Sequence, residues 1–155
     1  MLFRSINFSP DGQSVVISDD YLRLRIYRLK DLLSMGANPA IEADHLQELV
    51  GHTSIIFSMI YSPNSRQLAS ASADGTVRIW DLTTGKCVQT LTHAHWTIRA
   101  FFSPDGCQLF VSGMSSTIYV WDTITGELLR TLTGHTDWIW SIDQLKRFLI
   151  CERKV

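Results

Sequence analysis

Short runs of apolar and β-branched residues alternate with turn residues along the chain. Between residues 54 and 92 the runs cover 55–61, 67–72, 76–80 and 87–91, with Pro, Asn, Asp, Gly or Ser residues around them. Short runs rich in Ile, Val, Thr and aromatic residues and bounded by turn formers are typical of β-strands. Turns such as Ser62-Pro63 fix φ at the first turn position, so they predict hairpins between the first and second runs. The pattern therefore predicts an all-β chain.

The pattern repeats along the chain. Three kinds of marker recur: a His after a small residue, a Ser-Pro turn, and a Trp-Asp pair followed by a Thr-Gly turn. Their spacing is 41 or 42 residues, and a fixed period of this length indicates a repeat protein. The markers are His52, His93 and His135, then Pro63 and Pro104, then Trp80 and Trp121, then Gly85 and Gly126.

The repeated units resemble the WD repeats of β-propeller proteins. The resemblance lies in GH…SPNS…SADGTVRIWD…TTGK and THAHW…SPDG…YVWD…TITGE, and it covers roughly residues 2–143. In that family one repeat corresponds to about four strands, the number in one blade of a propeller. We therefore expect a partial WD-repeat β-propeller with three four-stranded antiparallel blades and the remnant of a fourth.

The blade boundaries follow from the positions of the markers. Within a single incomplete domain, 1–155, we expect blades at about 2–49, 54–91 and 96–132, and a partial fourth blade at about 137–151. Tyr27 takes the Trp place in the first blade, because it follows Pro10 by 17 residues, as Trp80 follows Pro63. Surplus residues at 31–43 predict an insertion before the outermost strand, with a short helical turn at 30–34.

The resemblance implies a structural hydrogen-bond network in the second blade. Its members are Trp80, Ser70 (or Ser72 on the same strand), His52 and Asp74. A buried indole N–H, an imidazole and a carboxylate all need partners, and a chain in this order satisfies them. Catalysis by this Ser/His/Asp set is the weaker interpretation, because the motif recurs inside stacked sheets and a Trp occupies the space that a substrate needs.

The third blade carries an incomplete version of this network. His93 and Trp121 are present, but Val111 stands at the Ser place and Ser115 at the Asp place. We therefore expect His93 to rely on water or on Ser115, and this blade to be the softer of the two. His135 marks the start of the next repeat.

A further group of residues lies where the loops open onto one face of the propeller. Large apolar residues stand three positions after each marker His, and two Trp and one Ile on one rim suggest a patch that binds a protein or peptide. The alternative is that these side chains fill the seams between blades. The candidate rim consists of Ile55, Ala73, Trp96, Met114, Asp137 and Trp138.

The sequence gives little support for binding of a metal, a cofactor, nucleic acid or a membrane. His93 and His95 lack a third ligand nearby, so we expect no metal, and no motif for a nucleotide or another cofactor is present. Arg23, Arg25, Arg28 and Lys30 form a basic run, which we interpret as a solvated outer strand. The 14 basic and 15 acidic residues give a net charge of −1, so we expect no nucleic acid and no membrane as partner.

Composition and length complete the prediction. With 45% hydrophobic residues and three cysteines in no CxxC pair, the chain is typical of a cytoplasmic globular protein with reduced thiols. We expect a non-catalytic scaffold module that binds other proteins or peptides; the alternative is a regulatory or sensor segment of a larger signalling enzyme.

Ring closure leaves two interpretations open. Closed propellers typically have four to eight blades, so this chain is either a fragment of a longer propeller or a half-ring that forms a homodimer. Residues 143–147 depart from the expected turn motif, which favours the fragment.

Overall fold

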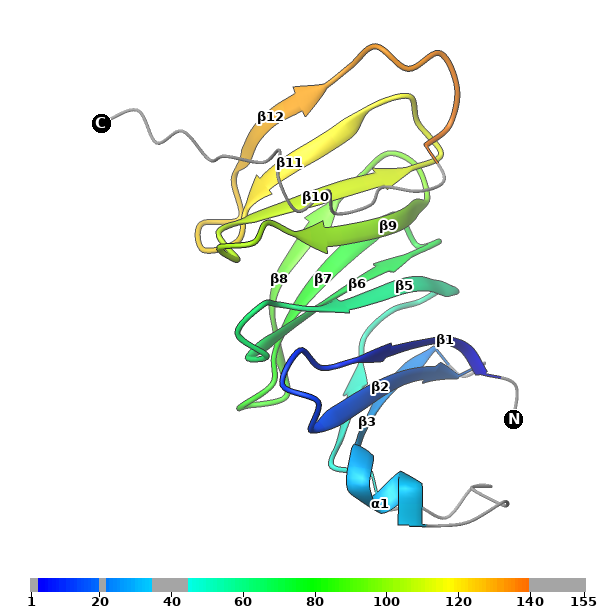
Figure 1. The fold of residues 1–155 in the computed structure, drawn as a ribbon. Helices are drawn as coiled ribbons and strands as arrows, with labels where there is room; N and C mark the ends of the chain where they lie inside the picture. The colour runs from blue at the N-terminus through cyan, green and yellow to red at the C-terminus, as the bar shows by residue number, and fades with distance from the viewer. Residues whose placement is uncertain (1–2, 20–21, 35–44, 140–155) are drawn as a thin grey trace.

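Within the described residues, twelve strands form three separate four-stranded sheets, stacked one on the next (Figure 1). The computed structural model describes residues 3–19, 22–34 and 45–139. The first sheet contains β1 (Phe3–Phe8), β2 (Ser14–Asp19), β3 (Arg23–Arg28) and β4 (Gln47–Val50). The second contains β5 (Ile56–Tyr61), β6 (Gln67–Ser72), β7 (Thr76–Asp81) and β8 (Lys86–Thr92). The third contains β9 (Thr97–Phe102), β10 (Gln108–Gly113), β11 (Ile118–Asp122) and β12 (Leu128–Leu132).

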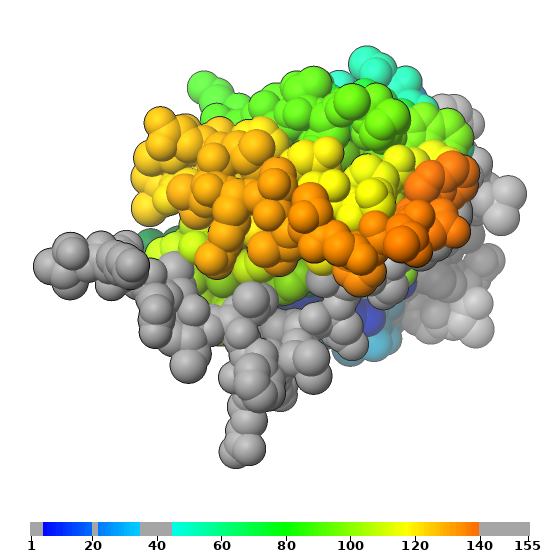
Figure 2. Space-filling model, turned by 90° about the horizontal axis from the view of Figure 1, so that it is seen from above, coloured from blue at the N-terminus to red at the C-terminus, as the bar shows by residue number. Residues whose placement is uncertain are grey.

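Each sheet is an antiparallel meander in chain order, so the all-β, three-blade prediction is confirmed. The first strands of the three blades, β1, β5 and β9, contact one another in sequence, and the later strands lead outward (Figure 1). Seen from above, the third blade hides most of the first (Figure 2). This stacking covers both faces of the second blade with its neighbours.

The hairpins between first and second strands have the predicted turn chemistry. Gly12 and Gly106 have φ angles of 69° and 74°, in the left-handed region that glycine enters without steric cost. In the second blade Ser65 adopts φ 58° at the same place. The Ser before each Pro accepts a hydrogen bond across the turn, as in the 2.9 Å bond from Gln67 N to Ser62 Oγ.

Strand register places the three large aromatic residues at equivalent positions. Val15 pairs with Tyr27, Leu68 with Trp80, and Leu109 with Trp121. Tyr27 therefore occupies in the first blade the place that Trp has in the other two.

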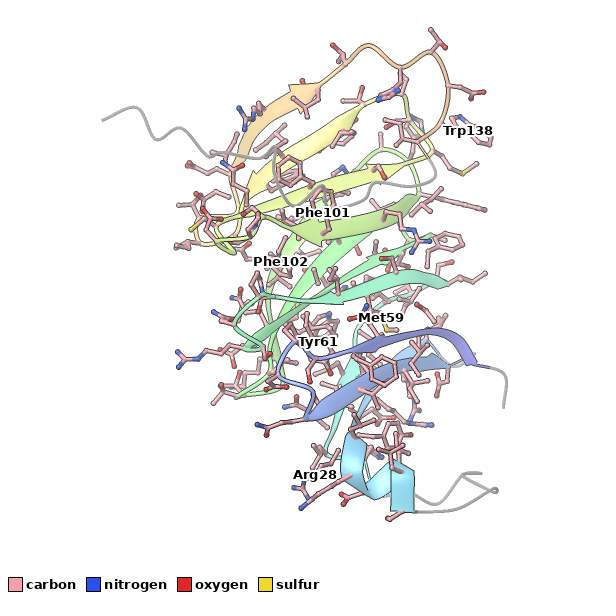
Figure 3. All side chains as sticks on the ribbon, in the orientation of Figure 1. Arg28, Met59, Tyr61, Phe101, Phe102 and Trp138 are labelled. Atoms are coloured by element: carbon pink, nitrogen blue, oxygen red, sulfur yellow. The ribbon has the colours of Figure 1, made fainter. Side chains whose placement is uncertain are left out.

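Two apolar layers hold the blades together. Met59 and Tyr61 on β5 lie between the first and second blades, and Phe102 on β9 lies between the second and third (Figure 3). The first layer contains Val16, Leu24, Ile26, Leu49, Ile56, Met59, Tyr61, Leu68 and Trp80. The second contains Ala69, Ala71, Val77, Ile79, Leu91, Ala100, Phe102, Leu109 and Val111.

The basic run differs from its prediction as a solvated outer strand. Arg23 and Arg25 lie on β3, the third of four strands, and β4 covers its outer edge. Arg25 pairs with Asp19 at 3.1 Å and with Glu48 at 3.3 Å, and Arg23 pairs with Glu48 at 3.0 Å. The acidic residues lie on neighbouring strands, where a linear reading of the run does not reveal them.

The insertion in the first blade begins with the helix α1 (Leu29–Ser34), one residue earlier than expected. The rest of the insertion, at 35–43, lies outside the described residues. The same is true of the expected fourth blade beyond Ile139.

Candidate functional site

The second blade contains a continuous chain of polar contacts. Trp80 Nε1 donates to Ser70 Oγ at 2.8 Å, and Ser70 Oγ lies 2.7 Å from His52 Nε2. His52 Nδ1 lies 2.8 Å from Asp74 Oδ2. Because the ionised Asp74 carboxylate can only accept, His52 Nδ1–H donates to it, and the neutral ring then accepts at Nε2 from the Ser70 hydroxyl. The bonds use Ser70 rather than Ser72, which donates to the Ser54 carbonyl at 3.0 Å.

Asp74 connects this hydrogen-bond network to the loop before β5. Its carboxylate accepts hydrogen bonds from Thr53 N at 3.0 Å, Thr76 N at 2.9 Å and Thr76 Oγ1 at 2.6 Å. Burial alone would raise the pKa of Asp74, but the hydrogen bonds from Thr76, His52 and Thr53 lower it to about 2. Burial also lowers the pKa of His52, and the bond to Asp74 opposes that shift. Asp74 thereby fixes the loop before β5 against the β6–β7 turn.

This geometry gives the Ser/His/Asp set a structural role. Ser70 is fully buried, and its oxygen already accepts from Trp80 and donates to His52. A catalytic serine needs an exposed oxygen next to a substrate cleft. In this arrangement Ser70 cannot reach a substrate.

The third blade lacks two of the four groups. Val111 replaces the serine and Ser115 replaces the aspartate, and His93 Nε2 and Trp121 Nε1 are buried without a partner in the described part of the chain. The His93 ring instead makes T-shaped contacts with the rings of Tyr119 and Trp121, with centroids 4.7 and 5.5 Å away. Burial without a compensating bond lowers the pKa of His93 to about 4.

The loops above these networks carry the candidate rim. Ala73 N donates to the Ile55 carbonyl at 2.8 Å, and the equivalent residues of the third blade repeat the bond from Met114 N to the Trp96 carbonyl at 3.0 Å. The two turns are therefore held side by side in each blade.

The rim continues past the third blade. Ile139 N lies 3.2 Å from the Gly113 carbonyl, so the segment that carries Asp137 and Trp138 lies against that blade. Trp138 projects from its edge (Figure 3). His135 is exposed in the same segment.

The rim tryptophans differ from the network tryptophan in exposure. Trp96 is 50% exposed and Trp138 48%, whereas Trp80 is 2% exposed. Ile55, Ala73 and Met114 are half-buried. The two rim tryptophans therefore do not fill seams between blades as Trp80 does.

Comparison with known proteins identifies the repeats. The family described as WD domain, G-beta repeat matches residues 43–81, 85–122 and 126–151. The chain belongs to the WD-repeat family. The first two matched segments contain β4 to β7 and β8 to β11, so each WD repeat supplies the outermost strand of one blade and three strands of the next.

Several WD-repeat relatives share parts of this sequence. WD repeat-containing protein AAC3 of Dictyostelium discoideum is 30% identical over 131 residues, covering 61% of this chain and 27% of that protein. Nuclear distribution protein PAC1 of Gibberella zeae is 41% identical over 68 residues, covering 38% and 15%. Ribosome biogenesis protein YTM1 of Scheffersomyces stipitis is 48% identical over 46 residues, covering 29% and 10%. The matches thus span about a quarter or less of these relatives.

One aromatic residue beside the candidate rim, Phe57, was not predicted from the sequence. Phe57 contacts Trp96 with ring centroids 5.9 Å apart. Phe57 lies where the β5–β6 register shifts between Ile56 and Ser58, and such bulges redirect side chains. The equivalent position in β9 is Ile98, at a matching shift between Ser112 and Gly113. The sequence shows the repeated position but not the bulge.

The part of the chain that the structure describes shows neither a metal-binding cluster nor a membrane-spanning helix. Within 3–19, 22–34 and 45–139, no group of three or more His, Cys, Asp or Glu side chains could hold a metal ion. Of the helices in the part that the structure describes, none is long and apolar enough to span a membrane.

Proposed function

We propose that this chain is a non-catalytic interaction module that binds a protein or peptide at its loop rim. Members of the WD-repeat family bind other proteins. The observation that carries the proposal is the pair of half-exposed tryptophans, Trp96 and Trp138, on adjacent loops of one face. Tryptophan is strongly enriched among the residues that contribute most of the binding free energy at protein interfaces. Burying an exposed indole against a partner removes apolar surface from water, which favours binding.

The candidate rim, Ile55, Ala73, Trp96, Met114, Asp137 and Trp138, has the layout of such an interface. Phe57 extends it, since its ring packs against Trp96. Apolar anchors with polar groups around them are the usual anatomy of a specific protein interface. Exposed Asp137, His95 and Arg99 supply polar groups on the rim and on β9.

The test replaces both anchors and leaves the fold intact. The Trp96→Ser/Trp138→Ser variant is compared with wild type and with Ile124→Ser, which removes an even more exposed apolar residue from the β11–β12 turn. Each protein is immobilised and exposed to a lysate of the organism that encodes it. The proposal predicts proteins retained by wild type and by Ile124→Ser but lost from the double variant, with unchanged thermal unfolding. Equal retention by all three proteins, or an unfolded double variant, would contradict it.

The incomplete ring is part of the same proposal. On β1, Ile6 and Phe8 are 56% and 55% exposed, whereas Met59 and Tyr61 at the same places on β5 are 4% and 3% exposed. A further blade against β1 would cover them. Size-exclusion chromatography with light scattering tests this: an Ile6→Lys/Phe8→Lys variant should remain folded and show less self-association than wild type. A wild-type chain that is monomeric at all concentrations would show that a second copy does not cover this face.

A further inference from the structure

The third blade has a small, partly open pocket under the rim. It encloses about 10 Å³, enough for the centre of one water-sized group. The lining includes His93, Val111 and Ser112 on the inner side, and Ser115 and the exposed His95 and Trp96 on the rim side. None of the lining residues is acidic. The pocket thus lies where the third blade lacks the aspartate of the second.

The second blade shows what occupies this place when the motif is complete. The Asp74 carboxylate accepts from His52 Nδ1, Thr53 N, Thr76 N and Thr76 Oγ1, over distances from 2.6 to 3.0 Å. Position 74 of the second blade corresponds to position 115 of the third. Replacing Asp by Ser removes the carboxylate and leaves the groups around it.

Those groups remain poorly satisfied in the third blade. Thr117, the counterpart of Thr76, has its N–H 3.4 Å from Ser115 Oγ, at the long limit of a hydrogen bond. No described residue bonds to a ring nitrogen of His93, the counterpart of His52. His52 turns Nε2 to Ser70 and Nδ1 to Asp74, so the unpartnered Nε2 of His93 reflects the serine that Val111 replaces, and its Nδ1 is the atom that would face the place of the missing aspartate. The His93 ring and the Thr117 N–H therefore lie at the place of the missing carboxylate, and the described residues offer them only the long bond to Ser115.

We infer that this pocket binds a carboxylate group of the protein partner, which takes in the third blade the place that Asp74 takes in the second. One carboxylate oxygen fits the enclosed space, and the rest of the group lies at the mouth beside Trp96. Charge-assisted hydrogen bonds are shorter and about twice as strong as neutral ones, so the carboxylate is favoured over water or a neutral amide. The inference rests on the proposed function, because the pocket opens onto the same rim, and it adds the chemical class of the recognised residue: Asp or Glu.

The first test uses acetate as the smallest carboxylate probe. Histidine C–H signals of the full chain are followed by NMR against pH, in acetate and in chloride at equal ionic strength, and the His93 signals are assigned with a His93→Gln variant. Burial holds the pKa of His93 at about 4 without a ligand. Binding should raise it, since a carboxylate favours the protonated ring. A tenfold preference of acetate for the protonated form raises the pKa by about 1.

Two variants separate the pocket from a general charge effect. Ser115→Asp supplies the carboxylate from the chain itself, so the pKa of His93 should be raised without acetate and should no longer respond to it. Ser116→Asp places the same charge one residue away, outside the pocket lining, and should keep the acetate response. An unchanged His93 in acetate, or equal responses of wild type and Ser115→Asp, would overturn the inference and leave only a water site.

A peptide comparison then distinguishes a protein side chain from a free small acid. N-acetyl-Gly-Asp-Gly-amide should shift the His93 signals, and the Asn analogue should not. A response to acetate without a response to the Asp peptide would overturn the assignment to a protein partner. None of these probes needs the natural partner, so their failure leaves the tryptophan rim to be judged by its own variants.

Discussion

Ser70 holds two buried rings of the second blade through one hydroxyl group. Replacing it by alanine removes the acceptor of Trp80 Nε1 and the partner of His52 Nε2, which are 2.8 and 2.7 Å away. A buried polar group left without a partner costs about 1–3 kcal/mol, so two such groups cost about 2–6 kcal/mol. Domains are stable by only about 5–15 kcal/mol, so Ser70→Ala should remove a large fraction of the free energy of unfolding.

The third blade offers a matched control for this substitution. Ser112 is a buried serine on β10, as Ser70 is on β6, but its hydroxyl has no partner in the described chain. Ser112→Ala removes the same atom from a buried strand position, the one that Ala71 occupies in the second blade, without leaving another group unsatisfied. Its effect should be close to zero or slightly stabilising.

Urea and thermal unfolding, followed by tryptophan fluorescence and circular dichroism, measure both variants. For a domain of this size, 1 kcal/mol corresponds to roughly 2–4 °C in Tm, so Ser70→Ala should lower Tm by about 5–20 °C while Ser112→Ala leaves it nearly unchanged. Equal losses in the two variants would refute the reasoning, because the cost would then come from the lost volume of an oxygen atom and not from the stranded rings.

Three other perturbations test the same energetics. Val111→Ser should give Trp121 Nε1 and His93 Nε2 the missing hydroxyl and raise the free energy of unfolding by about 1–2 kcal/mol in urea titrations, since two satisfied groups outweigh the lost apolar burial. Thr97→Val should lower it by about 1–3 kcal/mol and loosen the third blade in hydrogen exchange, because Thr97 Oγ1 accepts from Ser72 N at 2.9 Å and lies 2.8 Å from the Thr76 carbonyl. Acidification should destabilise the chain between pH 6.5 and 4, where His93 (pKa about 4) stays neutral when folded but binds a proton when unfolded. The loss is at most about 3 kcal/mol, and a His93→Gln variant measured across the same pH range should lack it.

Periodic features of the fold could be predicted from the sequence, because they depend on local chemistry. The Ser-Pro turns set the hairpins, and the distance from Pro10 identified Tyr27 as the substitute for tryptophan, as the register of Val15 with Tyr27 shows. The gaps in the third blade followed from comparing Val111 and Ser115 with Ser70 and Asp74. Each of these inferences compares equivalent positions within one chain.

The features that could not be predicted depend on contacts between strands. The partners of Arg25 are Asp19 and Glu48, far apart in sequence, so the basic run gave no sign of its neutralisation. Phe57 reaches Trp96 because a bulge shifts the register of β5, and bulges have no clear signal in a single sequence. The choice of Ser70 over Ser72 also needed the structure, since both serines lie on the same strand.

The contrast between the two networks connects stability with binding. The Trp80–Ser70–His52–Asp74 network of the second blade satisfies its own polar groups, and the rim residues Ile55 and Ala73 of that blade are both half-buried. The third blade leaves buried nitrogen atoms of His93 and Trp121 without a partner among the described residues, and His93 lines the same pocket as the exposed Trp96. Departures from locally favourable chemistry are most often retained where a protein binds something. Completing the network with Val111→Ser and Ser115→Asp together should therefore stabilise the chain and, in the same molecule, close the pocket to an external carboxylate, so that stability and recognition change in opposite directions.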